Sequence, residues 1–377
     1  MIRFLCLLLL AGSLAAATPP NIVFIISDDH AWTDYGFMGH PQIETPNLDR
    51  LQASSAAFTR GYVPTALCRP ALACFANGLY AHQSKITGND PSPLPGMAGG
   101  GKAKGAKGAK AKAGPAAEPE AYKALRGQLI DHFYEHPALP AMLAKQGYLS
   151  HQSGKWWEGA PQRAGFTHAM TRGFPQPGGR HGDDGLKIGR EGMEPVFGFI
   201  DHALAEKKPF FLWYAPFMPH TPHTPPDRLF QKYKAKGIAS DHVARYYAMV
   251  EWFDETCGQL MDRIEQKGQM ENTLFVYVAD NGWIQDPNSQ GYAPRSKQSA
   301  NEGGTRQPIL FSWKGVIQPG QRGEQLCSSI DIVPTALAAA GADIPANLPG
   351  LNLLPILKSG APSPRQDVFG ETFAHDV

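Results

Sequence analysis

Short apolar runs alternate with helical patterns along this chain. "NIVFIIS" at 21–27 is apolar and β-branched, which is typical of a central parallel strand buried on both faces. "TPNLDRLQASSAAF" at 45–58 predicts a helix, because Thr45 suits an N-cap and Pro46 suits the first helical position. Further buried strands are predicted at 209–215, 273–280 and 308–313, and further helices at 137–147, 194–206, 240–267 and 329–340. This alternation predicts an α/β fold with a mostly parallel central sheet and helices on both faces.

Two segments depart from that alternation. Residues 1–17 combine a basic Arg3, an apolar run and small residues, which predicts a cleavable secretory signal peptide and no membrane span after its removal. The alternative is a buried N-terminal helix. Residues 96–120 are rich in Gly, Ala and Lys without apolar periodicity, which indicates a low-complexity surface insertion. The alternative is that its lysines hold a polyanionic substrate or surface.

Composition narrows the class of protein. The 377 residues are 42% hydrophobic, enough for a large core, and the net charge of +1 gives no indication of nucleic-acid or anionic-membrane binding. A signal peptide would place the chain outside the cytoplasm, secreted or periplasmic. The cysteines beyond it are too few for a disulfide scaffold, and Cys68 and Cys74 are poorly placed to bond within one helix.

Cys68 occupies an unusual position. In "TALCRPALACFANG" (65–78) an extended apolar stretch runs into a predicted helix at this cysteine. It is either a buried packing residue or a reactive group at a helix N-terminus. Amide donors and the positive end of the helix dipole at such a terminus attract anions, which favours the second interpretation once an anionic substrate is implied.

Acidic and amide side chains follow two of the predicted strands. "SDDH" places Asp28 and Asp29 after the first strand, and "ADNGW" places Asp280 and Asn281 after a later one. Parallel sheets carry their sites at the carboxyl ends of the strands. Oxygen ligands there suit Ca²⁺ or Mg²⁺ better than zinc. Each pair alone is also compatible with ordinary turn chemistry.

The sequence resembles the type I sulfatases of the alkaline phosphatase superfamily. The matching stretches, in order, are "PNIVFIISDDH", "TPNLDRL", "CRPALACFANGLYAHQ", "SGKWW", "MPHTPH", "YVADNGW" and "EGGTRQPILF". The resemblance implies one catalytic domain over 18–377, interrupted by the insertion. It also implies hydrolysis of a sulfate ester, borne by a small molecule or a glycan, to an alcohol and inorganic sulfate.

The resemblance also implies a set of site residues. Cys68 would be oxidised by a separate formylglycine-generating enzyme, and the hydrate of the resulting aldehyde would be the nucleophile. The remaining assignments are one calcium ion held by Asp28, Asp29, Asp280 and Asn281, sulfate contacts from Lys155, His220 and Lys297, and a leaving-group acid at His220. Beyond that set, we expect further substrate contacts at Arg69 and His223. From the residues alone, Lys155 and Lys297 are more often ordinary solvated side chains, and either imidazole could satisfy a loop carbonyl.

The nucleophile motif departs from the family pattern. Sulfatases of this type usually read Cys-x-Pro-x-Arg, whereas this chain has Leu72 at the arginine position and Arg69 directly after the cysteine. On a helix, position i+4 shares a face with position i, while position i+1 is turned away by about 100°. Arg69 is therefore not a direct geometric substitute for the missing arginine.

Two further departures concern Trp157 and the C-terminal region. The family usually has a histidine where Trp157 stands, and an indole cannot accept a proton, so His82, His151 or His223 would have to replace it. The family also continues into a small antiparallel C-terminal subdomain, which we expect to be short or truncated here. Two alternatives stay open. One is a phosphate or phosphonate ester hydrolase of the same superfamily, because the same metal and lysines would serve a phosphoryl group. The other is a catalytically impaired binder of sulfated glycans, because Leu72 and Trp157 replace two expected groups.

Overall fold

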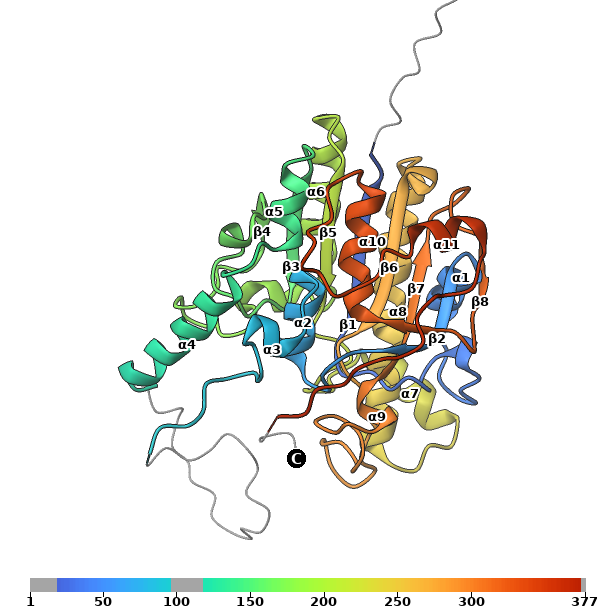
Figure 1. Ribbon diagram of the computed structural model, residues 1–377. Coiled ribbons are helices and arrows are strands. Elements are labelled where there is room, and N and C mark those ends of the chain that lie inside the picture. Colours follow the sequence, from blue (N-terminus) through green and yellow to red (C-terminus); the bar gives the residue numbers. More distant parts are fainter. Residues whose placement is uncertain (1–18, 96–117, 374–377) are drawn as a thin grey trace, which may run out of the picture.

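A nine-stranded sheet organises the described residues, 19–95 and 118–373, of the computed structural model (Figure 1). The strands lie in the order β4-β3-β5-β1-β6-β7-β2-β8, and β9 pairs with β2. Their bounds are β1 (Asn21–Ser27), β2 (Ala56–Tyr62), β3 (Leu149–Gly154), β4 (His168–Ala169), β5 (Phe210–Ala215), β6 (Thr273–Ala279), β7 (Arg306–Ser312), β8 (Gly320–Gln321) and β9 (Leu326–Ser328).

The sheet is mostly parallel, as the sequence predicts. β4, β3, β5, β1 and β6 form a continuous parallel run, whereas β7 runs antiparallel to both β6 and β2. Every residue of β1, β5 and β6 is buried, which agrees with their unbroken apolar sequences. The carboxyl ends of the parallel strands therefore meet at one edge of the sheet.

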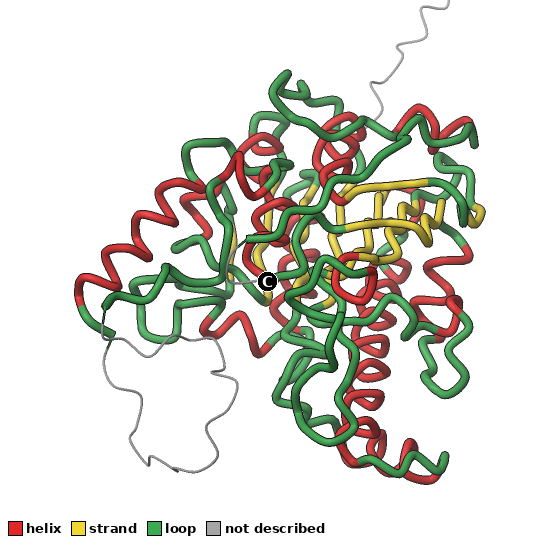
Figure 2. Tube along the Cα trace, turned by 60° about the horizontal axis from the view of Figure 1, so that its bottom comes forward, coloured by secondary structure: helices red, strands yellow, loops and turns green. Residues whose placement is uncertain are grey.

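Helices cover both faces of the sheet (Figures 1 and 2). Ile22, Phe24 and Ile26 of β1 belong to a core shared with α2, α5 and α10, while Val23 and Ile25 belong to a second core shared with α1, α6 and α8. The helices are α1 (Pro46–Ala53), α2 (Cys68–Asn77), α3 (Ala81–Ser84), α4 (Glu120–Phe133), α5 (Leu139–Ala144), α6 (Glu194–Ala205), α7 (Asp227–Ala235), α8 (Asp241–Gln266), α9 (Glu302–Thr305), α10 (Ile332–Ala339) and α11 (Leu354–Ser359).

The segment predicted as one helix at 45–58 divides into a helix and a strand. α1 begins at Pro46 as predicted but ends at Ala53, and β2 starts at Ala56. The hydroxyls of Ser54 and Ser55 both donate to the carbonyl of Leu51, at 2.9 and 2.6 Å. Serine side chains that bond the backbone in this way compete with helix propagation, which explains the early end of α1.

The predicted signal peptide and most of the predicted internal insertion lie outside the described residues. The signal peptide at 1–17 and most of the insertion at 96–120 fall there, so these boundaries stay predictions. Within 19–95 and 118–373, no helix combines the length and hydropathy needed to cross a membrane. Past α11, residues 360–373 form neither helix nor strand, and the Glu371 amide donates to the Pro64 carbonyl at 2.7 Å.

Candidate active site

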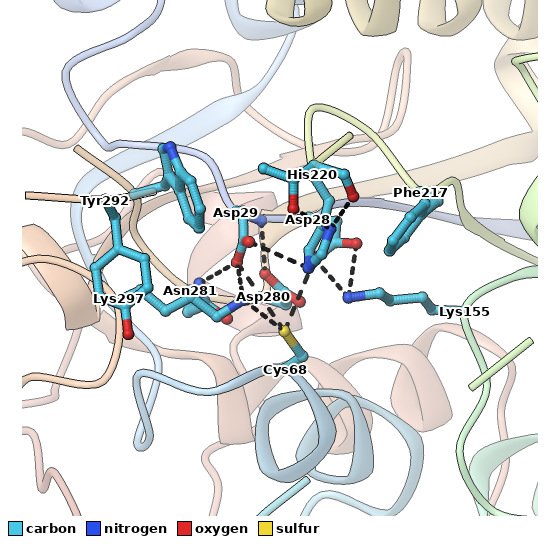
Figure 3. A network of polar contacts seen from close by, with 12 residues as sticks. Asp28, Asp29, Cys68, Lys155, Phe217, His220, Asp280, Asn281, Tyr292 and Lys297 are labelled. Carbon is cyan, nitrogen blue, oxygen red and sulfur yellow. Dashed lines mark hydrogen bonds and ion pairs between the residues drawn. The ribbon is translucent and has the colours of Figure 1, made fainter. Parts of the chain in front are cut away.

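A polar cluster occupies the edge where the carboxyl ends of the parallel strands meet (Figure 3). Its side chains come from distant segments and lie together between the sheet and the N-terminus of α2. They are Asp28 and Asp29 after β1, Asp280 and Asn281 after β6, Lys155 after β3, His220 after β5, Cys68 at the first position of α2, and Lys297 in the loop before α9. The structure thus brings eight of the ten predicted site residues together.

The loop after β1 directs two consecutive carboxylates into this cluster. Successive side chains of a strand point to opposite faces, but Asp29 has a left-handed φ of 63°, which ends that alternation. Its amide N–H donates to Asp280 Oδ1 at 3.0 Å, and its Oδ1 accepts from Asn281 Nδ2 at 2.7 Å. The β1 and β6 loops are therefore joined through their own acidic and amide groups.

The oxygen atoms of this cluster fit a divalent cation. Asp280 Oδ2 and Asn281 Oδ1 are buried without a hydrogen-bond partner in the described part of the chain. Buried polar atoms without a partner carry a desolvation cost, and a bound ion would remove it. Ligand atoms of Asp28 and Asp29 also lie within 4.8 Å of one another and of Cys68 and His220. Carboxylate and amide oxygens are the donors that calcium and magnesium prefer.

Neither lysine of the cluster is an ordinary solvated side chain. Lys155 Nζ lies 2.8 Å from Asp28 Oδ1, and Lys297 Nζ lies 2.5 Å from Asp29 Oδ1, with 2% and 9% of the two lysine side chains exposed. Burial acts to lower the pKa of each lysine, but the neighbouring carboxylates outweigh it and raise both pKa values. Two permanent cations thus border the site.

Lys155 reaches its position through a close approach of two strands. Gly154, the last residue of β3, has a φ of 85°, and a Cβ there would lie 1.8 Å from the carbonyl oxygen of Ala215. Only glycine allows the backbone this close. The next amide, that of Lys155, then donates to the same carbonyl at 2.8 Å.

Cys68 lies among these charges rather than within a purely apolar core. Its Sγ is 3.1 Å from Lys297 Nζ and 3.9 Å from Asp28 Oδ1. Burial raises the pKa of the thiol to about 12, against the opposing effect of Lys155 and Lys297. The thiol is therefore protonated at neutral pH and is a poor nucleophile in its unmodified form. All four cysteines of the described residues are buried and unbonded.

His220 presents one ring nitrogen to the cluster. Its Nδ1 lies 2.6 Å from the Thr221 carbonyl oxygen, so Nδ1 carries the hydrogen in the neutral ring and Nε2 faces Asp29 Oδ2 at 3.3 Å. The Phe217 ring stacks on the imidazole at a centroid distance of 4.3 Å. Burial lowers the pKa of His220 to about 4.

Arg190 fixes the loop that carries His220. Its guanidinium donates from Nη2 to the carbonyls of Phe217 and His220, at 2.6 and 3.0 Å, and from Nη1 to Thr224 Oγ1 at 3.1 Å. A planar fork of donors suits several acceptors held in one plane. The sequence reasoning missed Arg190, because no motif surrounds it and its partners lie about 30 positions further along the chain.

Two predicted substrate contacts lie outside the cluster. Arg69 directs its guanidinium to Glu158, with Nε–Oε1 and Nη2–Oε2 distances of 2.8 and 2.7 Å. His223 packs against the rings of Tyr246 and Trp283, and neither of its nitrogens has a hydrogen-bond partner among the described residues. A role for either residue in substrate binding stays a prediction.

A histidine absent from the sequence reasoning lies beside Trp157. His82 is exposed at the surface, and His151 is buried within β3, whereas the His181 ring is 5.1 Å from the Trp157 ring and 5.7 Å from that of Phe217. Nδ1 of His181 is buried without a hydrogen-bond partner in the described segments. His181 is therefore the histidine whose ring lies beside Trp157. The sequence shows no sign of this, because the two residues are 24 positions apart.

Comparisons with known proteins agree with this geometry. The family model described as Sulfatase matches residues 20–342. Arylsulfatase A of Homo sapiens is 32% identical, over 96% of this chain and 72% of its own length. N-acetylgalactosamine-6-sulfatase of Homo sapiens is 29% identical, over 93% of this chain and 68% of its own length. The crystal structure of Ps i-CgsB superposes with a TM-score of 0.69 and 25% identity, covering 90% of this chain and 76% of that one.

Proposed function

Because this chain belongs to the sulfatase family of the alkaline phosphatase superfamily and is a sulfuric ester hydrolase, we propose that its reaction takes place at the cluster around Cys68. The observation that carries the proposal is the position of Cys68 Sγ, 3.1 Å from the Lys297 ammonium and within 4.8 Å of the Asp28 and Asp29 carboxylates. A nucleophile position, two cations and a set of oxygen ligands thus share one buried site.

Asp28, Asp29, Asp280 and Asn281 would hold one calcium ion, which when bound supplies positive charge to the sulfate oxygens. Lys155 and Lys297 add their own charges on either side of Cys68. Charge accumulates on the sulfate oxygens and on the leaving alcohol in the transition state, so preorganised cations at that point provide the largest expected contribution to the rate. The low exposure of both ammonium groups strengthens this effect, because little water screens them.

Cys68 would act after oxidation to formylglycine by a separate generating enzyme; one hydroxyl of its hydrate attacks sulfur, and the other later expels sulfate. One feature of the chain supports this assignment over a thiol nucleophile. Burial raises the pKa of the thiol to about 12, which disfavours the thiolate at neutral pH. The N-terminus of the ten-residue helix α2 lies directly at this side chain and favours an anionic substrate there, whichever group attacks.

His220 would donate a proton to the departing alkoxide from Nε2, the ring nitrogen that faces the cluster, which requires the doubly protonated ring. Burial opposes that form, whereas the neighbouring Asp28 and Asp29 carboxylates favour it by raising the pKa of His220. The Thr221 carbonyl fixes the ring through Nδ1, and Phe217 excludes water from one of its faces.

We propose that the substrate class is a sulfated carbohydrate, in which the sulfate ester is carried by a small sugar molecule or by a glycan. One of the two human relatives, N-acetylgalactosamine-6-sulfatase, acts by its name on N-acetylgalactosamine 6-sulfate. Ps i-CgsB has been crystallised with k-i-k-neocarrahexaose. Both are relatives rather than this protein, so the particular ester is open to experiment. The predicted signal peptide supports a secreted or periplasmic location.

The modification of Cys68 can be measured directly. We expect protein produced beside a formylglycine-generating enzyme to carry an aldehyde at position 68, seen as a mass change in the tryptic peptide, and to hydrolyse a small aryl sulfate. Protein produced without that enzyme should retain the thiol and turn over at least about a hundredfold more slowly. Efficient hydrolysis of phosphonate esters by the unmodified protein would instead support the other superfamily activity.

Replacing Arg190 should weaken catalysis through the His220 loop. We expect Arg190→Met to lower kcat by about tenfold, because the loop loses the donors that fix its carbonyls and a small misplacement of a catalytic group is costly. Arg190→Lys keeps the charge but cannot span the same acceptors, so it should recover only part of the loss. The measurement is kcat with an aryl sulfate beside the melting temperature; an unchanged kcat in Arg190→Met would contradict the proposed role.

A further inference from the structure

The residue that directly follows Cys68 forms a buried ion pair that the proposed mechanism does not use. Arg69 Nε donates to Glu158 Oε1 at 2.8 Å, and Nη2 donates to Oε2 at 2.7 Å. Only 1% of the Arg69 side chain and 3% of the Glu158 side chain are exposed. This is the two-pronged geometry in which a guanidinium and a carboxylate fix each other's orientation as well as their distance.

The two partners belong to the segments that carry Cys68 and Lys155. Arg69 is the second residue of α2, whose first residue is Cys68, and Glu158 lies three residues after Lys155. The two positions are separated by 89 residues in the sequence. The pair therefore joins the segment of the proposed nucleophile to the segment of a proposed sulfate-binding lysine.

Further hydrogen bonds make both ends of this connection stiff. On the side of the helix, the Arg69 amide donates to Asn89 Oδ1 at 2.8 Å. On the other side, the carbonyl of Glu158 accepts from the Tyr134 hydroxyl at 2.6 Å, and the carbonyl of Lys155 accepts from Trp213 Nε1 at 3.1 Å. A displacement of either segment would have to break hydrogen bonds that are buried or partly buried.

The guanidinium of Arg69 is directed at Glu158 rather than at the cluster around Cys68. Both prongs of its fork are committed to Glu158, and Leu72, one helical turn from Cys68, packs in the apolar core. A buried carboxylate left without its partner would be strongly unfavourable, which keeps the arginine in place. The charge of this arginine is thus balanced within the protein by the carboxylate of Glu158.

We infer that the Arg69–Glu158 pair is a positioning device that sets the location of Cys68 relative to Lys155. The inference rests on the proposed function of these two residues and adds a pair that itself touches neither substrate nor metal. The quantity that the pair sets is the separation of Cys68 and Lys155 across Asp28, whose Oδ1 is 2.8 Å from Lys155 Nζ and 3.9 Å from Cys68 Sγ. A shift of about 1 Å between reacting groups can cost about a hundredfold in rate.

The test compares Arg69→Met and Glu158→Gln with a matched control, Arg365→Met. Arg365 forms a similarly buried two-pronged pair with Asp331, with 8% and 0% of the side chains exposed, and neither residue belongs to the site. For each full-length variant we would measure kcat and KM with an aryl sulfate, the fraction of Cys68 modified, and the melting temperature. Rates are expressed per modified site, at a temperature well below each melting point.

We expect Arg69→Met and Glu158→Gln to lower kcat per modified site by about 10- to 100-fold while KM changes by about twofold or less. Arg365→Met should lower the melting temperature without this loss of kcat, and Arg69→Lys should restore part of it. A kcat equal to that of the control would overturn the inference. So would a rise in KM as large as the loss of kcat, because it would make Arg69 a substrate contact.

The two proposals fail in different ways. Wild-type protein that is produced beside a formylglycine-generating enzyme, yet still carries an unmodified Cys68 and hydrolyses no sulfate ester, would overturn the proposed function. The positioning role would then be decided by a crystal structure of Glu158→Gln. A displaced Cys68 or Lys155 supports it, and an unchanged separation of Cys68 Sγ, Asp28 Oδ1 and Lys155 Nζ overturns it.

Discussion

Cys68→Ala is expected to abolish sulfate-ester hydrolysis, with kcat lower by roughly 10⁴–10⁶-fold, the range seen when a nucleophile that acts as part of a unit is removed. Alanine supplies no group that can attack sulfur, while Lys155, Lys297 and the oxygen ligands remain in place. The variant should therefore still bind inorganic sulfate. Calorimetric titration and a turnover assay on the same preparation would separate the two properties.

Cys68→Ser provides the more informative comparison. A serine hydroxyl can attack sulfur and release the alcohol, but it lacks the second hydroxyl that expels sulfate, so the reaction should stop after one turnover. We expect a covalent sulfate adduct at position 68, visible by intact-protein mass spectrometry, in Cys68→Ser and not in Cys68→Ala. Near wild-type turnover by Cys68→Ala would contradict a covalent mechanism and would require water to be the nucleophile.

The strands that could be predicted from the sequence are those that are both buried and made of apolar residues. β1, β5 and β6 are continuous apolar runs, and each was predicted within two residues of its observed bounds. β3 was missed because its sequence, "LSHQSG", is polar although most of it is buried. The hydroxyl of Ser153 donates to the Trp213 carbonyl at 2.9 Å, and Gln152 Oε1 accepts from the Thr171 amide at 3.2 Å. Hydropathy cannot register polar groups that are satisfied by tertiary contacts.

The residues of the candidate site also differ in how far they could be predicted from the sequence. The pairs Asp28–Asp29 and Asp280–Asn281 were predictable from chemistry and position, because strands of a parallel sheet end at a common edge. Lys155 and Lys297 required the family resemblance, since an isolated lysine carries no signal of burial. Glu158 was not predictable at all.

Glu158 illustrates why such residues escape sequence reasoning. In the sequence it is a single acidic residue after two tryptophans, and its partner Arg69 lies 89 positions earlier. The ion pair can form only because the fold places the segment after β3 beside the N-terminus of α2. The same holds for Arg190, whose acceptors are backbone carbonyls that no side-chain pattern records.

Removing one oxygen ligand should affect both catalysis and stability. We expect Asp280→Ala to lower turnover by about 10²–10³-fold or more, because a fixed positive charge at the sulfate oxygens would be lost with the ion. Calcium should raise the melting temperature of the wild type, with a stabilisation of about 2.7 kcal/mol when the free ion is at roughly a hundred times its Kd. In Asp280→Ala that increase should disappear.

The two oxygens of Asp280 allow a sharper test. Oδ1 accepts from the Asp29 amide at 3.0 Å, while the buried Oδ2 has no hydrogen-bond partner among the described residues. Asp280→Asn keeps an acceptor for the amide but removes the charge, so it should fold as well as the wild type while losing most of the calcium response. Asp262→Ala, at an exposed carboxylate paired with Arg50, serves as the control and should leave both properties unchanged. Full activity of Asp280→Asn after exhaustive chelation would show that the cluster needs no ion, and the positive charge at the sulfate would then have to come from Lys155 and Lys297 alone.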